Sequence, residues 1–572
     1  MKNVEANKVS GVMSRLLKNE EGNVLALFAA AVIPFFGLVG GGVDMSRIYL
    51  SQTRLQGACD AGALIGRKTM GLGKWADNGN AAKTQAEKLF DQNFPSGAYG
   101  TTGLVRSFAE SNGNVKGTAS VTIPMTLMRV LGQKSQAVSV SCQAELRVPN
   151  TDVMFVLDTT GSMDEPIPNS GSTEPKIDGL RKAVKCFYEA LAKQNITDIQ
   201  PSDCGETSDP TASNLGSVQM RFGFVPYAVN VNVGRLLPLD YMADRWTYQS
   251  REASFDTKND FSGWTYKPVT FNVSGLKGTG KNPWQSSLQL PIGDKGANTT
   301  VNWAGCIEER QTFRAPDSDP SNDWDPIPST ALDMDIDLVP TKSNVASQWG
   351  PMLPSAIWQR YNFTTFWGIR VRSTRSLENI SVAANSSDTM PTVADSCPTA
   401  ARTFQTWEAS DFSKYVNDLT TGGSTYHDIG LLWGARIMSP TGIFAELNAP
   451  KNMTIERHMV FMTDGDTQTN EDDYSAYGVH WYDRRQTPTG SAPTSSLLEK
   501  LTDARTVALC EAIKNKNINL WVVSYGSVSG TTSDRLRACA TPGKFVQASS
   551  VASLISNFKE IAAKISALRL TK

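Results

Sequence analysis

Hydrophobic positions near the start of the chain follow two patterns in succession. Residues 24–43, VLALFAAAVIPFFGLVGGGV, form one uncharged apolar run. Such a run is long enough to cross a bilayer as a helix and longer than the apolar part of a cleaved secretory signal. Apolar residues then recur at helical spacing over 45–70 and alternate with polar ones over 117–148. We therefore expect a transmembrane helix over 23–43 and, over 44–148, a helical stalk packed on a small sheet.

From residue 150 onward, buried strands are predicted to alternate with helices. Continuous apolar runs are DVMFVLD, VQMRFGFVPYAV, RHMVFMTD and INLWVVSY, and helical spacing follows or separates them over 176–193, 495–516 and 551–568. Strands that are apolar on both faces and alternate with helices are typical of a doubly wound α/β sheet. We expect this domain to occupy residues 150–572.

The alternation stops between about residues 235 and 420. This stretch is rich in Asn, Ser, Asp, Pro and Gly, yet it also holds most of the 13 tryptophans of the chain. It is too aromatic for a disordered linker and predicts a large irregular or β-rich insertion in one loop of the α/β domain. The aromatic side chains either line a sugar-binding surface or form the insertion's own core, and the core is favoured because large aromatics dominate cores generally. The tryptophans concerned are Trp246, Trp264, Trp284, Trp303, Trp324, Trp349, Trp358, Trp367 and Trp407.

Charge restricts the partners and sets the expected topology. The formal net charge is -1 and no basic stripe is present, which argues against a nucleic-acid partner. Lys2, Lys8, Arg15 and Lys18 precede the apolar run, and basic residues beside a span tend to stay in the cytoplasm. We expect a single-pass protein of the cell membrane with a cytoplasmic segment over 1–22. The domains after the span would then be periplasmic or extracellular.

The 8 cysteines contain no C-x-x-C pair, and an oxidising outer compartment favours disulfides. Helical segments on either side of the strand INLWVVSY carry Cys510 and Cys539, which we expect to pair. The same adjacency argument pairs Cys306 with Cys397 and Cys59 with Cys142, and it leaves Cys186 for Cys204. Other pairings of eight cysteines remain open at the level of sequence.

Oxygen-bearing side chains follow the predicted strands. Asp158, Thr160 and Ser162 come directly after the first buried strand, Asp464 ends another, and Thr425 precedes a helical stretch between them. Because parallel strands present their carboxyl ends at one edge of a sheet, three loops deliver these side chains to one place. Oxygen-only ligation favours Mg²⁺, or else Mn²⁺ or Ca²⁺. We predict a metal site that leaves one position open for a partner's carboxylate; the alternative is that these residues only cap helices and turns.

These residues resemble the metal-ion-dependent adhesion site of the von Willebrand factor A family. The D-x-[ST]-x-S motif of that family stands here as Asp158-x-Thr160-x-Ser162, the second-loop threonine matches Thr425, and the third-loop aspartate matches Asp464 in TDG. The resemblance implies the fold of that family and assigns metal-binding roles to these five residues. Thr160 replaces the commoner serine and keeps the hydroxyl.

A second resemblance covers nearly the whole chain. The start, EEGNVLALFAAAVIPFFGLVGGGVDMSRIYLSQTRLQGACDAGAL, together with LDTTGSM, WAGCIEER and STYHDIGLLWGARIMSPTG, is similar to TadE/TadG-type (TadG-like) tight-adherence proteins of bacteria. This resemblance implies a membrane-anchored binding protein of Flp pilus assembly or adhesion. Its partner would be a pilus or secretion-system component, or a surface ligand that offers a carboxylate. Related minor pilins carry a glutamate early in the span; residues 23–27, NVLAL, do not, which argues against cleavage after Gly22.

Enzyme motifs are missing from the sequence. There is no H-E-x-x-H, and Ser162 does not lie in G-x-S-x-G. We therefore interpret the chain as a binding protein and not an enzyme. A free-standing surface adhesin without pili, and a secretion-linked hydrolase with its catalytic residues in the insertion, are the alternatives.

Overall fold

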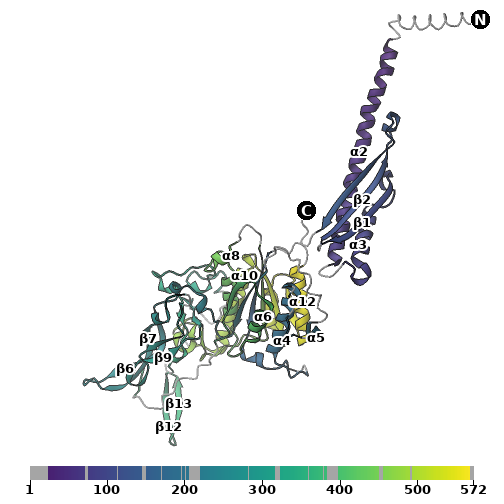
Figure 1. The fold of residues 1–572 in the computed structure, drawn as a ribbon. Helices are drawn as coiled ribbons and strands as arrows, with labels where there is room; N and C mark the ends of the chain where they lie inside the picture. Colours follow the sequence, from purple (N-terminus) through teal and green to yellow (C-terminus); the bar gives the residue numbers. More distant parts are fainter. Residues whose placement is uncertain are drawn as a thin grey trace, which may run out of the picture. The chain divides into compact units, whose positions relative to one another are not determined.

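The stretches of the chain before and after residue 148 fold as separate units. One unit ends at Val148, and the other begins at Pro149 (Figure 1). The computed structural model describes residues 23–566 apart from 71–74, 112–113, 145–149, 169–170, 193, 195, 200, 205–219, 281–282, 316–322, 359, 376, 378, 383–396, 450–454 and 490–491. The predicted cytoplasmic segment over 1–22 lies outside these residues.

Helix α2 (Asn23–Met70) dominates the N-terminal unit (Figure 1). Its first half exposes large apolar side chains such as Phe28 and Leu38, whereas its second half buries Leu55 and Ala58 against a sheet. An apolar surface open to the surroundings is what a bilayer would cover. Within the described part of the chain, α2 is the helix long and apolar enough to cross a membrane.

The small sheet of this unit is antiparallel, in the order β1-β2-β3. Its strands are β1 (Thr102–Ser111), β2 (Asn114–Pro124) and β3 (Ser135–Ala144), and α3 (Asp77–Asn93) packs beside α2. The helix-on-sheet stalk is as predicted, but α3 and β1 were not anticipated. Both are rich in polar and small residues, and their buried positions are too few to give a clear period.

Asp44 attaches helix α2 to the segment between β2 and β3. Its carboxylate is buried and accepts the backbone N–H groups of Thr126, Leu127 and Met128 at 2.8–3.2 Å. Burial alone would raise the pKa of Asp44, but these donors, with help from the Arg47 guanidinium, hold that pKa below its usual range. Each donor left unpaired in a buried site costs about 1–3 kcal/mol, so the acidic residue directly after the span has a structural role.

The C-terminal unit is built on a six-stranded sheet in the order β15-β5-β4-β16-β19-β20. Neighbouring strands are parallel except at the edge, where β15 runs antiparallel to β5. The strands are β4 (Asn150–Asp158), β5 (Met220–Tyr227), β15 (Arg402–Gln405), β16 (Ile455–Thr463), β19 (Asn519–Tyr525) and β20 (Phe545–Ala548). The four strands that the sequence predicts coincide with β4, β5, β16 and β19.

Helices cover both faces of this sheet. On one face, α4 (Lys176–Ala192), α6 (Ala409–Asn417) and α12 (Val551–Ser566) pack through Phe187, Phe412 and Phe558. On the other face lie α7 (His427–Met438), α10 (Ser495–Asn515) and α11 (Gly530–Cys539). The structure therefore confirms the doubly wound α/β class. Shorter helices are α5 (Pro201–Cys204), α8 (Ala445–Asn448) and α9 (His480–Asp483), with a β17 (Tyr474–Ser475) and β18 (Gly478–Val479) hairpin.

The insertion ends earlier than the sequence indicates. We placed it over about 235–420, but β15 and α6 fall inside that range and belong to the α/β sheet and its helical layer. Correcting this boundary moves the end of the insertion to before Arg402. The four-residue strand β15 is too short to show a period, and its Asn- and Ser-rich surroundings hide it.

Short β-elements and turns make up the insertion (Figure 1). β6 (Arg245–Phe255) and β7 (Phe261–Asn272) form a long hairpin extended by β14 (Ile380–Val382). Further pairs are β8 (Ser287–Leu290) with β9 (Thr299–Asn302), β10 (Ile307–Glu308) with β11 (Gly350–Pro351), and β12 (Tyr361–Phe366) with β13 (Ile369–Arg375).

The nine tryptophans of the predicted 235–420 stretch mostly form cores, as the sequence favoured. Trp407 lies beyond the corrected end of the insertion and belongs to the core of the α/β sheet. Six are buried, Trp246 and Trp284 pack against the buried cluster, and Trp367 alone of the nine is open, at 88% exposure on the β12–β13 turn. The buried ones are Trp264, Trp303, Trp324, Trp349, Trp358 and Trp407. Aromatic packing thus holds together a region with few long strands.

All four predicted disulfides are confirmed. Cys59 pairs with Cys142, Cys186 with Cys204, Cys306 with Cys397, and Cys510 with Cys539. The first bond links α2 to β3. The last links α10 to α11, the helices that precede and follow β19 in the chain. The adjacency of elements around one strand was therefore a sound guide to the pairing.

Candidate metal site at the carboxyl edge of the sheet

The predicted site lies where the strand order of the sheet reverses direction. β4 and β16 are neighbours and parallel, with Leu157 opposite Met462. The chain leaves β4 toward β5 on one side and later returns through β16 on the other. Loops that diverge at such a point leave a ligand-binding crevice beyond the strand ends. Asp158 and Asp464 stand at this point on adjacent strand ends.

A relay of hydrogen bonds joins four of the five predicted residues. The Thr160 hydroxyl donates to Asp158 Oδ1 at 2.7 Å, and the Ser162 hydroxyl donates to Asp464 Oδ1 at 2.9 Å. The two hydroxyl oxygens lie 3.1 Å apart. When each hydroxyl directs its hydrogen at a carboxylate, the lone pairs of both oxygens remain free to bind a cation. That arrangement suits a cation.

Thr425 reaches the same edge through its backbone. Thr425 exchanges two backbone hydrogen bonds with Gln468, on the loop after Asp464, at 2.9 and 3.1 Å. Just before it, the carbonyl of Gly423 accepts the N–H of Gly161 at 3.0 Å. The second loop is therefore held between the first and the third, and Thr425 itself is buried.

Helix α7 can follow Thr425 closely because two glycines face the sheet. A Cβ at Gly430 would lie 2.6 Å from the ring of Tyr227, and one at Gly434 would lie 2.5 Å from Val156. Both distances are too short for a side chain. Glycine at these positions lets α7 lie directly on β4 and β5 and so sets the height of the Thr425 loop.

The surroundings of Asp158 disfavour its ionised form. Burial, followed by repulsion from Asp464, raises the pKa of Asp158 to about 7, although hydrogen bonds from Thr160 and Thr463 oppose the shift. A neighbouring cation would reverse such a shift. Ser162 is partly exposed and Gly161 is exposed, so the cluster is open to solvent on one side.

Lys176 is a member of the site that sequence reasoning missed. Its ammonium lies 2.7 Å from Asp464 Oδ2, and both side chains are buried, at 7% and 0% exposure. Lys176 is the first residue of α4, where a lysine is expected to point into solvent. Only the return of α4 beside the third loop places the ammonium here, and no spacing in the sequence signals this.

His427, in the first turn of α7, was also missed. Its Nε2 lies 2.9 Å from the hydroxyl of Thr463, which donates to Asp158 Oδ2 at 2.8 Å. Burial lowers the pKa of His427 to about 3, so the ring is neutral. The other ring nitrogen, Nδ1, lies 3.1 Å from the hydroxyl of Thr467, so the ring is held between Thr463 and Thr467. The position of His427 two residues after Thr425 was the available signal.

The second aspartate of TDGD has a different role. Asp466 Oδ1 accepts the backbone N–H and the hydroxyl of Ser529, each at 3.0 Å. Ser529 is the residue before α11. Asp466 therefore binds the residue before α11 and stabilises the start of that helix.

The residues present fit a hard divalent cation. Two carboxylates and two facing hydroxyls are oxygen donors of the kind that Mg²⁺ and Mn²⁺ prefer. A bound ion of this kind supplies a strong electrophile with a free position for a further oxygen. Asp158 and Asp464 would balance its charge, Thr160 and Ser162 would offer neutral ligands, and Thr425 stands on the second loop of the same edge.

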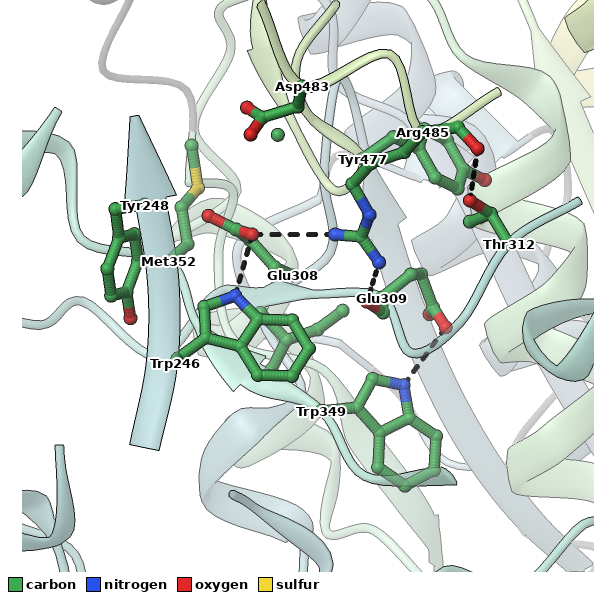
Figure 2. A network of polar contacts seen from close by, with 12 residues as sticks. Trp246, Tyr248, Glu308, Glu309, Thr312, Trp349, Met352, Tyr477, Asp483 and Arg485 are labelled. Atoms are coloured by element: carbon green, nitrogen blue, oxygen red, sulfur yellow. Dashed lines mark hydrogen bonds and ion pairs between the residues drawn. The ribbon is translucent and has the colours of Figure 1, made fainter. Parts of the chain in front are cut away.

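A second acidic cluster lies at the junction with the insertion and is closed to solvent. Glu308 accepts Trp246 Nε1 at 2.7 Å and the Tyr474 hydroxyl at 2.6 Å, with Arg485 at 3.4 Å (Figure 2). Burial raises the pKa of Glu308 to about 7 despite Arg485. A shifted pKa of this kind occurs at catalytic sites, but also in structural networks.

The neighbouring carboxylate of this cluster serves a structural role. Glu309 accepts Trp349 Nε1 at 3.0 Å (Figure 2). It also accepts Trp433 Nε1 and Arg436, each at 2.7 Å, and is fully buried. Trp433 and Arg436 belong to α7, so Glu309 ties the insertion to that helix. With its donors in place and no exposed surface, this pair of glutamates offers no access for a substrate.

Comparisons with known proteins agree with the N-terminal resemblance. Residues 22–77 match the family model described as putative Flp pilus-assembly TadE/G-like. A search of curated proteins gave no match. Among solved structures, the vWF domain of the type V pili tip protein Mfa5 from Porphyromonas gingivalis matches over 74% of this chain and 97% of that one. With 10% identity and a TM-score of 0.28, that match adds no weight to the fold, which rests on the strand order.

The raised pKa of Asp158 makes metal affinity depend on pH. A ligand carboxylate must lose its proton, so Mg²⁺ affinity of the full-length protein in detergent should rise about tenfold per pH unit up to about pH 7 and then level off. The metal-free protein should lose stability as pH rises from about 4 through 7, because the folded pKa exceeds the unfolded one.

Calorimetry in buffers of different ionisation enthalpy measures both the affinity and the protons released. We expect close to one proton released at pH 6 and almost none at about pH 8.5. Asp158→Asn should abolish binding and proton release together. Affinity that stays constant across this range would contradict the assignment of Asp158 as a ligand.

Proposed function

We propose that this chain, which combines a TadE/G-like N-terminal segment with a von Willebrand factor A domain, is a membrane-anchored binding protein of Flp/Tad pilus assembly or adhesion. It grips a protein partner through a metal-ion-dependent adhesion site. The metal is Mg²⁺, with Mn²⁺ or Ca²⁺ as substitutes. The ligands are Asp158, Thr160, Ser162, Thr425 and Asp464.

The relay from Asp158 through Thr160 and Ser162 to Asp464 carries this proposal. The oxygens are assembled in advance, face one another, and border solvent at Gly161. A partner's aspartate or glutamate would complete the site with a charge-assisted contact of strict geometry. No histidine or lysine in the described loops is placed to transfer a proton to such a partner: His427 is bound on both ring nitrogens, and Lys176 is paired with Asp464.

The membrane helix supports the location that we propose. α2 exposes apolar side chains over its first half, and residues 22–77 match a pilus-assembly model. Basic residues before the span favour a cytoplasmic N-terminus. The C-terminal unit would then be periplasmic or extracellular, and four disulfides are in keeping with an oxidising compartment.

Two other functions are less well supported. A surface adhesin without pili would use the same metal site with a different partner, and neighbouring genes for a pilus ATPase and a prepilin peptidase would distinguish it. A hydrolase would need catalytic residues in the insertion. The carboxylates of Glu308 and Glu309, two buried acids of the insertion, are enclosed by their donors.

The proposed topology predicts the location of the C-terminal unit. A periplasmic alkaline phosphatase fused to the C-terminus of the chain should be active in bacterial cells, because that enzyme matures only outside the cytoplasm. A β-galactosidase fusion at the same point serves as the reciprocal control. Active β-galactosidase with a stable but inactive phosphatase would place the C-terminal unit inside the cell.

The proposed function predicts different effects for two aspartates of one loop. Asp464→Asn removes a ligand charge, so it should strongly reduce pilus display or surface attachment, compared at equal abundance of anchored protein. Asp466→Asn makes the same substitution two residues away and keeps the acceptor for Ser529, so attachment should stay at the parental level. Both are measured in cells with protein abundance checked by immunoblot.

Chelation of divalent ions should reduce attachment of the parent to the level of Asp464→Asn and should have little further effect on that variant. Parental attachment by Asp464→Asn at normal abundance would show that the protein does not work through this site.

A further inference from the structure

The placement of Lys176 is costly and therefore informative. Lysine is almost never fully buried unless it is paired. Lys176 also occupies the first turn of α4, where the partial positive charge of the helix end disfavours a cation. Burial of its charge and its position at the helix N-terminus are thus two unfavourable contributions to the free energy of folding at Lys176. The compensating contact is the 2.7 Å ion pair with Asp464.

The ion pair involves a residue of the proposed metal site. Asp464 Oδ1 accepts Ser162, and Asp464 Oδ2 faces Lys176. The two acids of the cluster and the ammonium together leave one negative charge. A divalent ion beside them would leave one positive charge, and an ion without the ammonium would leave none. Lys176 is therefore electrostatically opposed to an ion at the same carboxylate.

Local contacts keep the ammonium in position. The N–H of Lys176 donates to the carbonyl of Glu165 at 3.0 Å, and Pro166 pairs with Pro175. Both contacts tie the start of α4 to the segment that follows the Asp158–Ser162 loop. The ammonium is thus held by the segment that directly follows the loop with three of the proposed ligands, Asp158, Thr160 and Ser162. Any rearrangement of that loop on binding an ion is therefore transmitted to Lys176.

We propose that Lys176 is a built-in counter-cation of the metal site, which neutralises Asp464 in the metal-free protein and opposes the binding of a divalent ion. This inference rests on the proposed metal site and adds its regulation. When no metal ion is bound, the ammonium offsets part of the free-energy cost of burying the two acids. It also sets the metal affinity lower than the ligands alone would give, so that the ion is exchanged readily.

The test compares Mn²⁺ binding by variants of the full-length protein in detergent. Lys176→Gln removes the charge and should tighten Mn²⁺ binding by about tenfold or more, because the opposing cation is gone. Lys176→Arg keeps the charge and should bind Mn²⁺ no more tightly than the parent. Lys182→Gln is the matched control, since Lys182 lies on the same helix and pairs with Glu174 at 2.9 Å, away from the cluster.

Thermal unfolding without metal gives a readout that does not depend on affinity. Lys176→Gln should unfold at a lower temperature than the parent in chelator, and Mn²⁺ should raise its unfolding temperature by more than it raises that of the parent. If the variant folds only with metal present, it is prepared in Mn²⁺ and stripped by dialysis. Loss of structure on stripping, with recovery on adding Mn²⁺, then supports the same role.

The outcomes separate this inference from the metal site itself. Mn²⁺ binding by the parent with equal or weaker binding by Lys176→Gln would overturn the role of Lys176 and leave the metal site standing. Tighter binding by Lys176→Arg as well would show that charge is not the cause, and would also overturn it. No Mn²⁺ binding by either parent or Lys176→Gln would overturn both the metal site and the inference.

Discussion

Two carboxylates, Asp158 and Asp464, lie beside each other at the ends of adjacent buried strands, and the surrounding structure compensates for their repulsion. Burying an ionised acid without compensation costs several kcal/mol, so each oxygen needs a donor or a cation. Thr160, Thr463 and Ser162 supply hydroxyl donors, and Lys176 supplies a charge. Because this pair of acids destabilises the fold, we interpret it as a site that binds a cation.

The insertion is coupled to this site through helices rather than through the sheet. Glu309 of the insertion binds Arg436 on α7, and Asp333 of the insertion binds Arg505 on α10, which also binds Asp428 in the first turn of α7. These ion pairs are fully buried, and removing one partner of such a pair is strongly destabilising. α7 begins directly after the Thr425 loop. The insertion and the Thr425 loop are therefore held on one helix. Changes in the insertion can then alter the proposed choice of partner without changing the proposed ligands.

Much of the fold was predictable because its central strands are apolar on both faces. The strands β4, β5, β16 and β19 are continuous apolar runs that must be buried. The acids at the ends of β4 and β16 indicate the candidate site. β15 and α3 were missed because short or polar elements form only when the rest of the structure holds them in place. Lys176 and His427 were missed for another reason. Their contacts join residues far apart in sequence, and neither side chain differs locally from an ordinary surface lysine or core histidine.

The central claim is that a divalent ion occupies the space between the facing hydroxyls of Thr160 and Ser162. Anomalous diffraction from a crystal grown or soaked with Mn²⁺ tests it most directly. One strong manganese peak is expected within bonding distance of the hydroxyl oxygens of Thr160 and Ser162. The other three proposed ligands, Asp158, Thr425 and Asp464, should surround the same peak. A crystal saturated with Mn²⁺ that shows no peak at this edge of the sheet, or manganese bound only at exposed carboxylates elsewhere, would contradict it.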